Sequence, residues 1–553
     1  DLYSVNVGDT PRDVYVVFTN PTSGTIEAPV VENLSVAPRS VSGEPDTLSE
    51  GERTLAIDRA TSGPIALRDN PEIADWQPPP LSPAGSRSLT PPPPNLAAVP
   101  GPDRYVDSGA SEVNNTYSEW DGATNTITYD FYYDSTNEPI PSVLAYRVPG
   151  VSTPHGTKTL EVAWQAWDEN SGSTNLWPIT ADMATALGQS FLASGGTDND
   201  IYDWVSATFG AEWSLEAAQK YVDVVEEYDT ITILLYPIHI YQTDPGPGGV
   251  VGFFWSKDNV LTSSVSYSNE RIMFYIDSET LGAQDGQGGW SITDFWPSEI
   301  VSTLGHELQH MIHFHERYIL RDANTATWLN EMMSLAAEDL IEYHRFMPGP
   351  RGVDPSSYPA GTAGPTSNQR GRLPLYNLAN DISLTGWNSS GDVLESYSIA
   401  YAFGAYLGRN FGGARVFEEM IASSSSASDT VLSESIQAAT GEAGMTLEEL
   451  LWRWGAAVIL SDDTAATPHR LNPGTWMDSS FGGLDYRLGS INLYNYRDAS
   501  TTVAGPHFQT GTISLSTMRP TSKILYRVGT GLTGSVELEI DFSEGMDFAV
   551  VVK

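Results

Sequence analysis

Residues 306–310 read HELQH, and residues 328–331, at the start of another apolar run, read WLNE. Two histidines four residues apart lie on one face of an α-helix, so His306 and His310 can reach the same ion. A zinc ion in a hydrolase needs three protein ligands and an open position for water, and Glu331 on a second helix is the candidate third ligand. Glu307 projects near the same face, where it can accept a proton from the attacking water. The two stretches therefore predict a zinc site with a general base beside it.

The residues around the first stretch are typical of an amphipathic helix rather than a chance match. Ser298 follows Trp296 and Pro297 and is a candidate N-cap, with Glu299 in the first turn. Apolar residues then recur at helical spacing while the histidines share the opposite side; the apolar stripe is Ile300, Leu304, Leu308 and Met311. One face of the helix is thus expected in a core, with imidazoles on the other.

Two further histidines, His313 and His315, follow closely. Three ligands from His306 to His313 on one straight helix would span about 10 Å, which is too long for one ion with bonds of about 2 Å. The metzincin arrangement, with a glycine after the second histidine and a third histidine six residues on, is not met, because position 316 is Glu316. We therefore expect His313 and His315 to support the ligands from outside or to lie on the surface.

The two stretches resemble those of the gluzincin clan of zinc peptidases and, within it, the hyicolysin family of secreted bacterial metallopeptidases. The resemblance covers roughly residues 155–465 and includes, upstream of the zinc motifs, DTITILLY at 229–236, VGFF at 251–254, SNE at 268–270 and MFYID at 273–277. One position departs from the thermolysin pattern, in which an aspartate four residues after the third ligand supports a zinc histidine. That position is Leu335 here, so the support must be built differently.

The resemblance also implies a helix that bears a catalytic tyrosine. The run from Ser396 to Phe411, with Gly412 near its end, is similar to the tyrosine-bearing helix of the gluzincin aminopeptidases. Counting back from its end places Tyr397 on the catalytic tyrosine, which would donate a hydrogen bond to the developing oxyanion. Tyr401, one turn later, is the reserve, and both could be ordinary packed tyrosines. Other possible donors are His469, His344 and His239.

The composition limits the classes of function. The chain has 553 residues, 70 acidic and 28 basic residues, a net charge of −42 and no cysteine. The charge argues against nucleic-acid binding, and the missing cysteines exclude disulfides and thiol chemistry. Carboxylates could form cation sites, but no EF-hand spacing is present, so a Ca²⁺ site would need scattered carboxylates. No apolar run is long enough to span a membrane, and the start at Asp1 is consistent with a trimmed, exported, secreted or cell-surface product. The sequence does not set an oligomeric state.

The expected fold class is multidomain α+β: a gluzincin-type zinc peptidase core, with a mixed sheet and active-site helices, flanked by β-sandwich-like domains. We expect a β-rich domain at 1–76, a proline-rich linker at 77–109, the catalytic region at 110–470 and a second β-rich domain at 471–553. The elements expected within these regions are helices near 181–194 and 214–227, a strand at 230–236, an alternating strand at 535–542 and a closing strand at 548–552.

Three functions fit these observations. The first is an exported zinc endopeptidase that acts on proteins or peptides. The second is a surface adhesive or structural protein with an idle peptidase core, which the β-rich regions favour and the presence of Glu307 beside three ligand-type residues disfavours. The third is an aminopeptidase, which typically needs a strand like Gly-x-Met-Glu-Asn to hold the substrate amine, and this strand is not found. The endopeptidase is preferred.

Overall fold

The structure is a computed structural model of the chain. It describes residues 2–33, 53, 66–67, 78–84, 105–106, 128–132, 139–165, 179–193, 200–226, 229–238, 249–284, 289–345, 372–388, 393–474, 477–496 and 505–553. Most of the expected linker at 77–109 lies outside these residues. None of the described helices is both long enough and apolar enough to cross a membrane.

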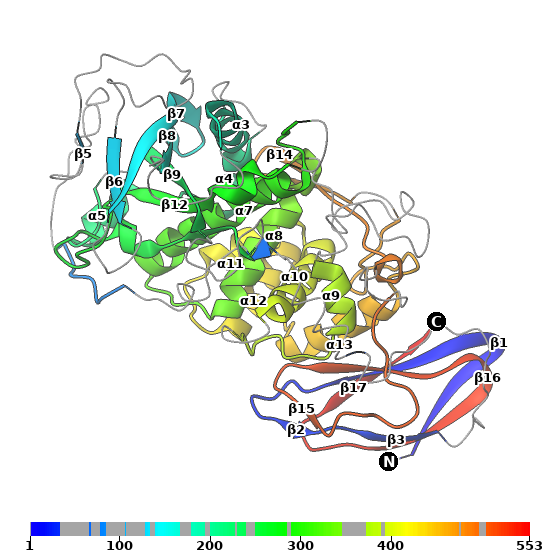
Figure 1. Cartoon of the computed structure of the whole chain (residues 1–553). Coiled ribbons are helices and arrows are strands. Elements are labelled where there is room, and N and C mark those ends of the chain that lie inside the picture. Colours follow the sequence, from blue (N-terminus) through cyan, green and yellow to red (C-terminus); the bar gives the residue numbers. More distant parts are fainter. Residues whose placement is uncertain are drawn as a thin grey trace.

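A seven-stranded mixed sheet forms one side of the main body (Figure 1). Its order is β11-β12-β9-β8-β7-β6-β5. The pairs β12–β9 and β9–β8 are parallel, and the other pairs are antiparallel. The strands are β5 (Tyr105–Val106), β6 (Thr128–Tyr132), β7 (Pro139–Thr153), β8 (Gly156–Gln165), β9 (Thr230–Tyr236), β11 (Gly252–Phe254) and β12 (Ile272–Asp277). This confirms a mixed α+β class for the chain.

The central strands are apolar on both faces because each face is covered. In β9, Ile231, Ile233 and Leu235 belong to the large core shared with the helices. Leu234 and Tyr236, which point the other way, belong to a second core with Phe253 and Tyr275. Parallel strands are normally buried on both faces and consist of nearly continuous apolar residues. The expected strand at 230–236 is therefore confirmed at those bounds.

The helices form the rest of the main body. The upstream ones are α3 (Ala181–Phe191), α4 (Ile201–Phe209), α5 (Leu215–Lys220) and α6 (Ser278–Gly282). The central ones are α7 (Phe295–His313), its π-helical continuation η3 (Phe314–Ile319), α8 (Thr327–Arg345), α9 (Arg372–Leu378) and α10 (Val393–Asn410). The last are α11 (Ala414–Ala422), α12 (Ser428–Thr440) and α13 (Leu447–Ile459). The expected helix near 214–227 is much shorter than expected, because the chain is in bridges and bends from Tyr221 onward.

The start of α7 corrects the expected N-cap. Ser298 lies inside the helix, and its N–H donates to the carbonyl of Asp294 at 2.8 Å, which makes Asp294 the residue before the first turn. Pro297 falls within that first turn, where a backbone N–H has no helical acceptor and a proline costs nothing. Pro297 is therefore part of the first turn of α7 and not of the loop before the helix.

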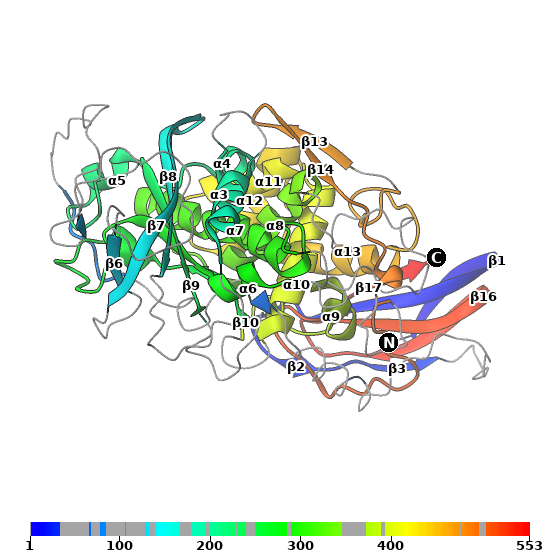
Figure 2. The same cartoon turned by 45° about the horizontal axis from the view of Figure 1, so that its top comes forward.

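The two ends of the chain form one sheet, which differs from the expectation of two separate β-rich domains. The order is β17-β1-β16-β3, where β1 is Leu2–Thr19, β3 is Val30–Asn33, β16 is Lys523–Asp541 and β17 is Asp547–Val552. A small sheet of β2 (Ile26–Glu27) and β15 (Thr517–Met518) lies beside it, and the two share an apolar core. Figures 1 and 2 show the blue and red strands together at one end of the molecule.

The strands expected near the C-terminus are confirmed. In β16, Val536, Leu538 and Ile540 are buried and the residues between them are exposed, and β17 closes the chain. The hairpin of β13 (Met477–Phe481) and β14 (Leu484–Leu488) instead belongs to the main body. Its Tyr486 is buried and donates a hydrogen bond to the carbonyl of Trp204 on α4 at 2.8 Å.

The terminal sheet packs on α13, and a buried lysine lies in this contact. A Cβ on Gly455 of α13 would lie 2.4 Å from Val17 of β1, so only glycine allows this approach. Lys523, the first residue of β16, places Nζ 3.1 Å from the ring centroid of Trp454 and 5.2 Å from that of Tyr376. Nζ has no hydrogen-bond partner among the described residues, and burial lowers the pKa of Lys523 well below its usual value.

We expect Lys523→Met to raise the free energy of unfolding by roughly 1 kcal/mol at pH 7, since it removes a buried amino group that has no hydrogen-bond partner among the described residues and keeps an apolar stem. Because the folded-state pKa is lowered, the unfolded chain binds more protons, and the stability of the parent rises with pH up to the ordinary pKa of 10.5. The advantage of methionine should therefore shrink as the pH rises. Denaturant unfolding at pH 6, 7.5 and 9 measures this. Lys553→Met, at a partly exposed lysine, is the control; an equal gain at every pH would contradict the expectation.

Candidate metal centre

The two histidines of the first stretch and the glutamate of the second meet in the contact between α7 and α8. The distance between Nε2 of His306 and Nε2 of His310 is 3.1 Å. Oε2 of Glu331 lies 3.3 Å from the first nitrogen and 3.5 Å from the second. Three ligands on a tetrahedral zinc ion, with bonds of about 2.0–2.2 Å, are separated by about 3.3–3.5 Å. The three atoms are thus spaced like one face of a zinc tetrahedron.

The state of Glu331 also fits a cation. Its side chain is buried, and Oε2 faces both imidazoles yet forms no hydrogen bond with any described residue. Burial by itself raises the pKa of Glu331, but the imidazoles of His310 and His306 outweigh it and lower the pKa to about 2. A buried carboxylate oxygen without a donor is costly unless a cation compensates it. Within the described part of the chain, these three residues are the one group of His, Asp and Glu side chains with metal-ligand geometry, and no cluster of carboxylates there supports a Ca²⁺ site.

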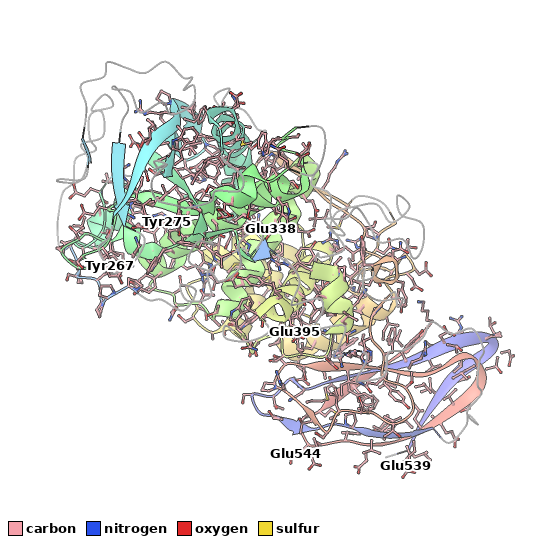
Figure 3. All side chains as sticks on the ribbon, in the orientation of Figure 1. Tyr267, Tyr275, Glu338, Glu395, Glu539 and Glu544 are labelled. Atoms are coloured by element: carbon pink, nitrogen blue, oxygen red, sulfur yellow. The ribbon has the colours of Figure 1, made fainter. Side chains whose placement is uncertain are left out.

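Glu338 supplies the support for His306 that Leu335 lacks. Its Oε1 accepts a hydrogen bond from Nδ1 of His306 at 2.8 Å, and its Oε2 accepts one from Ser302 Oγ at 2.9 Å. A carboxylate on Nδ1 holds the proton there and leaves the lone pair of Nε2 for a metal. Glu338 lies seven residues after Glu331 and hence on the same face of α8 two turns later. That spacing is a signal that our sequence analysis missed; Figure 3 labels Glu338 in the helical body.

His310 is held by residues next to the ligands in sequence. Its Nδ1 lies 3.2 Å from Oδ1 of Asn330 and 3.1 Å from Oγ of Ser334. Ser334 in turn donates to Oε1 of Gln309. Both candidate ligand histidines are therefore oriented from α8, which also carries Glu331.

The backbone of the edge strand β11 binds the side chain of Glu307, which belongs to α7. Oε2 of Glu307 accepts a hydrogen bond from the backbone N–H of Phe254 at 2.8 Å. Gly252, two residues earlier, lies close to both α7 and β12, and a Cβ there would be 2.7 Å from Thr303 of α7 and 2.9 Å from Ile276 of β12. This close approach brings the strand within reach of the carboxylate. The sequence motif could not reveal a partner that is a backbone amide.

A buried polar cluster ties the residues after β11 to β12. Lys257 Nζ lies 2.5 Å from Oδ1 of Asp258 and donates to the hydroxyl of Tyr275 at 3.0 Å. Tyr275 in turn donates to Oδ2 of Asp258 at 2.7 Å, and its ring stacks on Phe253 at 4.6 Å. Figure 3 shows Tyr275 in the part of the molecule that contains the sheet. The cluster keeps the residues on both sides of Phe254 in place.

The structure separates the two candidate tyrosines. The ring of Tyr397 lies 6.3 Å from that of His306, contacts Trp387 edge-on at 5.0 Å and has the guanidinium of Arg372 4.8 Å from its centre. Tyr401 instead donates to Oδ1 of Asp339 at 3.0 Å, and Asp339 also pairs with Arg409. Tyr397 is therefore beside the candidate ligands, and the hydroxyl of Tyr401 is used in a buried ion-pair cluster.

The remaining histidines are placed elsewhere. His313 and His315 are both buried, which corrects the expectation that they could lie on the surface. His315 bonds to the carbonyl of Ala211 at 2.8 Å and to Ser214 Oγ at 2.9 Å, and burial lowers the pKa of His313 well below its usual value. Neither belongs to the candidate ligand group. His469 lies against Trp452 on α13. His239 and the side chain of His344 lie outside the described residues.

Comparisons with known proteins show the family to which the chain belongs. The model of the peptidase M30 family matches residues 151–477. The neutral metalloprotease ShpI of Staphylococcus hyicus is 26% identical over 264 residues, which are 46% of this chain and 49% of that protein. The chain therefore belongs to the peptidase M30 family, and the resemblance to hyicolysin-like metallopeptidases is confirmed. The chain spans about half the length of this curated relative.

Solved structures with some similarity are zinc metallopeptidases of another family. A mutant M1 zinc metallopeptidase from Deinococcus radiodurans has a TM-score of 0.27 and 11% identity, covering 61% of this chain and 60% of that one. A second structure, titled as the M1 zinc metallopeptidase from the same organism, has a TM-score of 0.24 and 11% identity, with coverages of 62% and 55%.

We expect Glu338→Gln to weaken metal binding by about 10–100-fold, the usual effect of losing a carboxylate that orients a metal-binding histidine. The glutamine is nearly isosteric, so the folded structure of the metal-free protein should change little. Competition for zinc with a chelator measures the affinity, and Glu449→Gln on α13 is the control for removing one carboxylate. An unchanged affinity would show that Glu338 does not orient His306.

Proposed function

We propose that this chain is an exported zinc endopeptidase that hydrolyses internal peptide bonds of proteins. The observation that carries the proposal is the buried triangle of His306, His310 and Glu331, with Glu307 on the same helix between the two histidines. Membership of the peptidase M30 family supports it. A surface adhesive with an idle core is less consistent with this site, because a degenerate site usually lacks one of the ligand-type residues or the candidate base, and this chain has all four.

In the proposed mechanism His306, His310 and Glu331 would hold one Zn²⁺ ion, which would supply Lewis acidity to the scissile carbonyl and to the attacking water. Glu307 takes the proton from that water as the carbonyl carbon is attacked. It then delivers a proton to the leaving amine when the C–N bond breaks. The Phe254 N–H bonds to Oε2 of Glu307 and so fixes the direction in which the carboxylate faces.

Tyr397 is the proposed donor to the oxyanion. Tyr397 lies on α10, and the contacts of its ring with Trp387 and Arg372 hold the side chain beside His306. A donor aimed at the developing charge contributes about 3 kcal/mol to the stability of the transition state. Tyr401 is less suited, because its hydroxyl already donates to Asp339.

Endopeptidase rather than aminopeptidase activity is proposed from the edge strand. Strand β11 is at the end of the sheet order and is flanked on one side by β12. An extended peptide could add to its other side by backbone hydrogen bonds. The strand and the residue after it read Gly252-Phe253-Phe254-Trp255, with no carboxylate to hold a substrate amine. A strand without such a carboxylate cannot bind the free amino group at the end of a substrate chain.

Replacing the base and replacing a ligand should have different effects. Glu307→Gln should keep the metal and lose most of the activity, because Glu307 is not a ligand but accepts the proton. His310→Ala should lose metal and activity together. Elemental analysis of both purified variants, with cleavage of an unfolded protein with and without a chelator, measures this. Cleavage by Glu307→Gln at the rate of the parent would refute its role, and full zinc content in His310→Ala would refute the ligand assignment.

Tyr397→Phe should lower kcat by about two orders of magnitude while KM, zinc content and thermal midpoint stay nearly unchanged, because the bond is made only in the transition state. Tyr401→Phe is the matched control on the same helix. It should lose stability by about 1–3 kcal/mol, since it leaves the buried Asp339 with one donor fewer, and keep its turnover. If the two variants exchanged these effects, the donor would be Tyr401.

A further inference from the structure

Residues from the N-terminal part of the chain contact the main body on both sides of the candidate site. The first contact is Arg53, which is buried at the end of α9. Its Nε donates to the carbonyl of Leu378 at 2.6 Å, and its other nitrogens bind both carboxylate oxygens of Asp381. Helix α9 begins with Arg372, which lies over the ring of Tyr397. Arg53 is thus anchored on the helical side of the site.

The second contact is on the sheet side. The carbonyl of Ser82 accepts from the N–H of Val222 at 2.9 Å, and the N–H of Ala84 donates to the carbonyl of Lys220 at 2.8 Å. The N–H of Ser82 also donates to Oδ2 of Asp223 at 2.6 Å. The residues that follow, Val224 and Val225, pair with the segment just after β11. Ser82–Ala84 is therefore anchored next to the sheet.

Between these anchors, β4 (Ala66–Leu67) pairs in parallel with β10 (Gly249–Val250). Strand β10 ends two residues before β11 begins, so β4 pairs with the residues that lead directly into the strand whose Phe254 N–H binds Glu307. Both cartoons show β4, a short blue arrow, close to α10 in the middle of the molecule (Figures 1 and 2).

The direction of the backbone groups indicates which side of this segment β4 takes. The carbonyl of Val251 accepts from the N–H of Asp277 and thus faces β12. The N–H of Phe254 faces Glu307, away from β12. Because these directions alternate along an extended chain, Gly252 and Val250 face the same side as Phe254. That is the side to which a substrate backbone would add.

We propose that the segment bearing Ala66–Leu67 competes in cis with the substrate for the outer side of residues 249–254. The surface recognises an extended peptide backbone through its main-chain hydrogen bonds, and β4 takes its upstream end. This inference rests on the proposed peptidase function. A two-residue pairing contributes only a few hydrogen bonds of about 1 kcal/mol each. The anchors at Arg53 and Ser82–Ala84 keep the segment nearby at a high effective concentration, and a substrate can displace it.

Such a competitor raises the apparent KM and leaves kcat unchanged, because it only reduces the fraction of molecules open to substrate. Two variants weaken it at different points. Ala66→Pro removes the N–H that faces β10 in this register and leaves the anchors intact, and Arg53→Gln removes the first anchor. Arg415→Gln, which removes an exposed arginine paired with Glu419 on α11, is the matched control.

We expect both variants to lower the KM for an unfolded protein by about threefold or more at constant kcat, and the control to match the parent. Hydrogen exchange at the amides of Val250 and Gly252 should be faster in Ala66→Pro. A synthetic peptide of residues 60–72 should slow that exchange again when added to the variant.

A rise in KM with a fall in kcat would instead mean that the segment supports the site, and unchanged exchange would overturn the pairing. If no form of the protein cleaved any substrate, the proposed function would fail while the exchange and peptide measurements would still decide this proposal.

Discussion

The contact between α7 and α8 is the constraint on which the candidate site depends. It brings two imidazole nitrogens and a carboxylate oxygen to separations of 3.1–3.5 Å without a hydrogen bond to compensate Glu331 Oε2. Two glycines permit this packing. A Cβ on Gly305 of α7 would lie 2.6 Å from Ile341 of α8, and one on Gly404 of α10 would lie 3.1 Å from Met332 of α8. Helix α8 is therefore packed closely between α7 and α10, and both sides of the site are set by it.

Helix α8 is unusual in the number of carboxylates that it buries. Glu331 faces the two histidines, Glu338 holds His306, and Asp339 pairs with Arg409 and Tyr401. Buried charges rarely stabilise a fold relative to apolar residues, because desolvation offsets the attraction between them. Their arrangement is better explained by orientation: each carboxylate fixes a side chain that contacts the site or the helix that carries Tyr397. The pairing of Asp339 with Arg409 fixes α10 against α8, and thereby places Tyr397 beside His306.

The N-terminal part of the chain contacts later parts of the chain in two ways. Strand β1 pairs with β16 and β17, so that the first and last described residues share one sheet and one core. Residues between this sheet and the catalytic region contact α9, β10 and the segment after α5. The N-terminal part is thus in contact with both sides of the candidate site. The proposed competition between β4 and the substrate depends on this arrangement.

The sequence by itself determined the local features of the site. The four-residue spacing of His306 and His310 places them on one helix face, whatever surrounds the helix, and the apolar run of β9 predicts a central strand. The composition and the motif together pointed to a zinc peptidase. These inferences succeed because helical and strand periodicities are local properties of the backbone.

Only the tertiary structure decided which groups meet across elements. The N–H of Phe254 on Glu307 and the hydrogen bond of Tyr401 to Asp339 each join residues that are far apart in sequence. The joining of the two chain ends in one sheet is of the same kind, since a strand's pattern shows which face is buried but not which strand lies beside it. Contacts of this kind depend on how whole helices and strands pack, and no local periodicity encodes them.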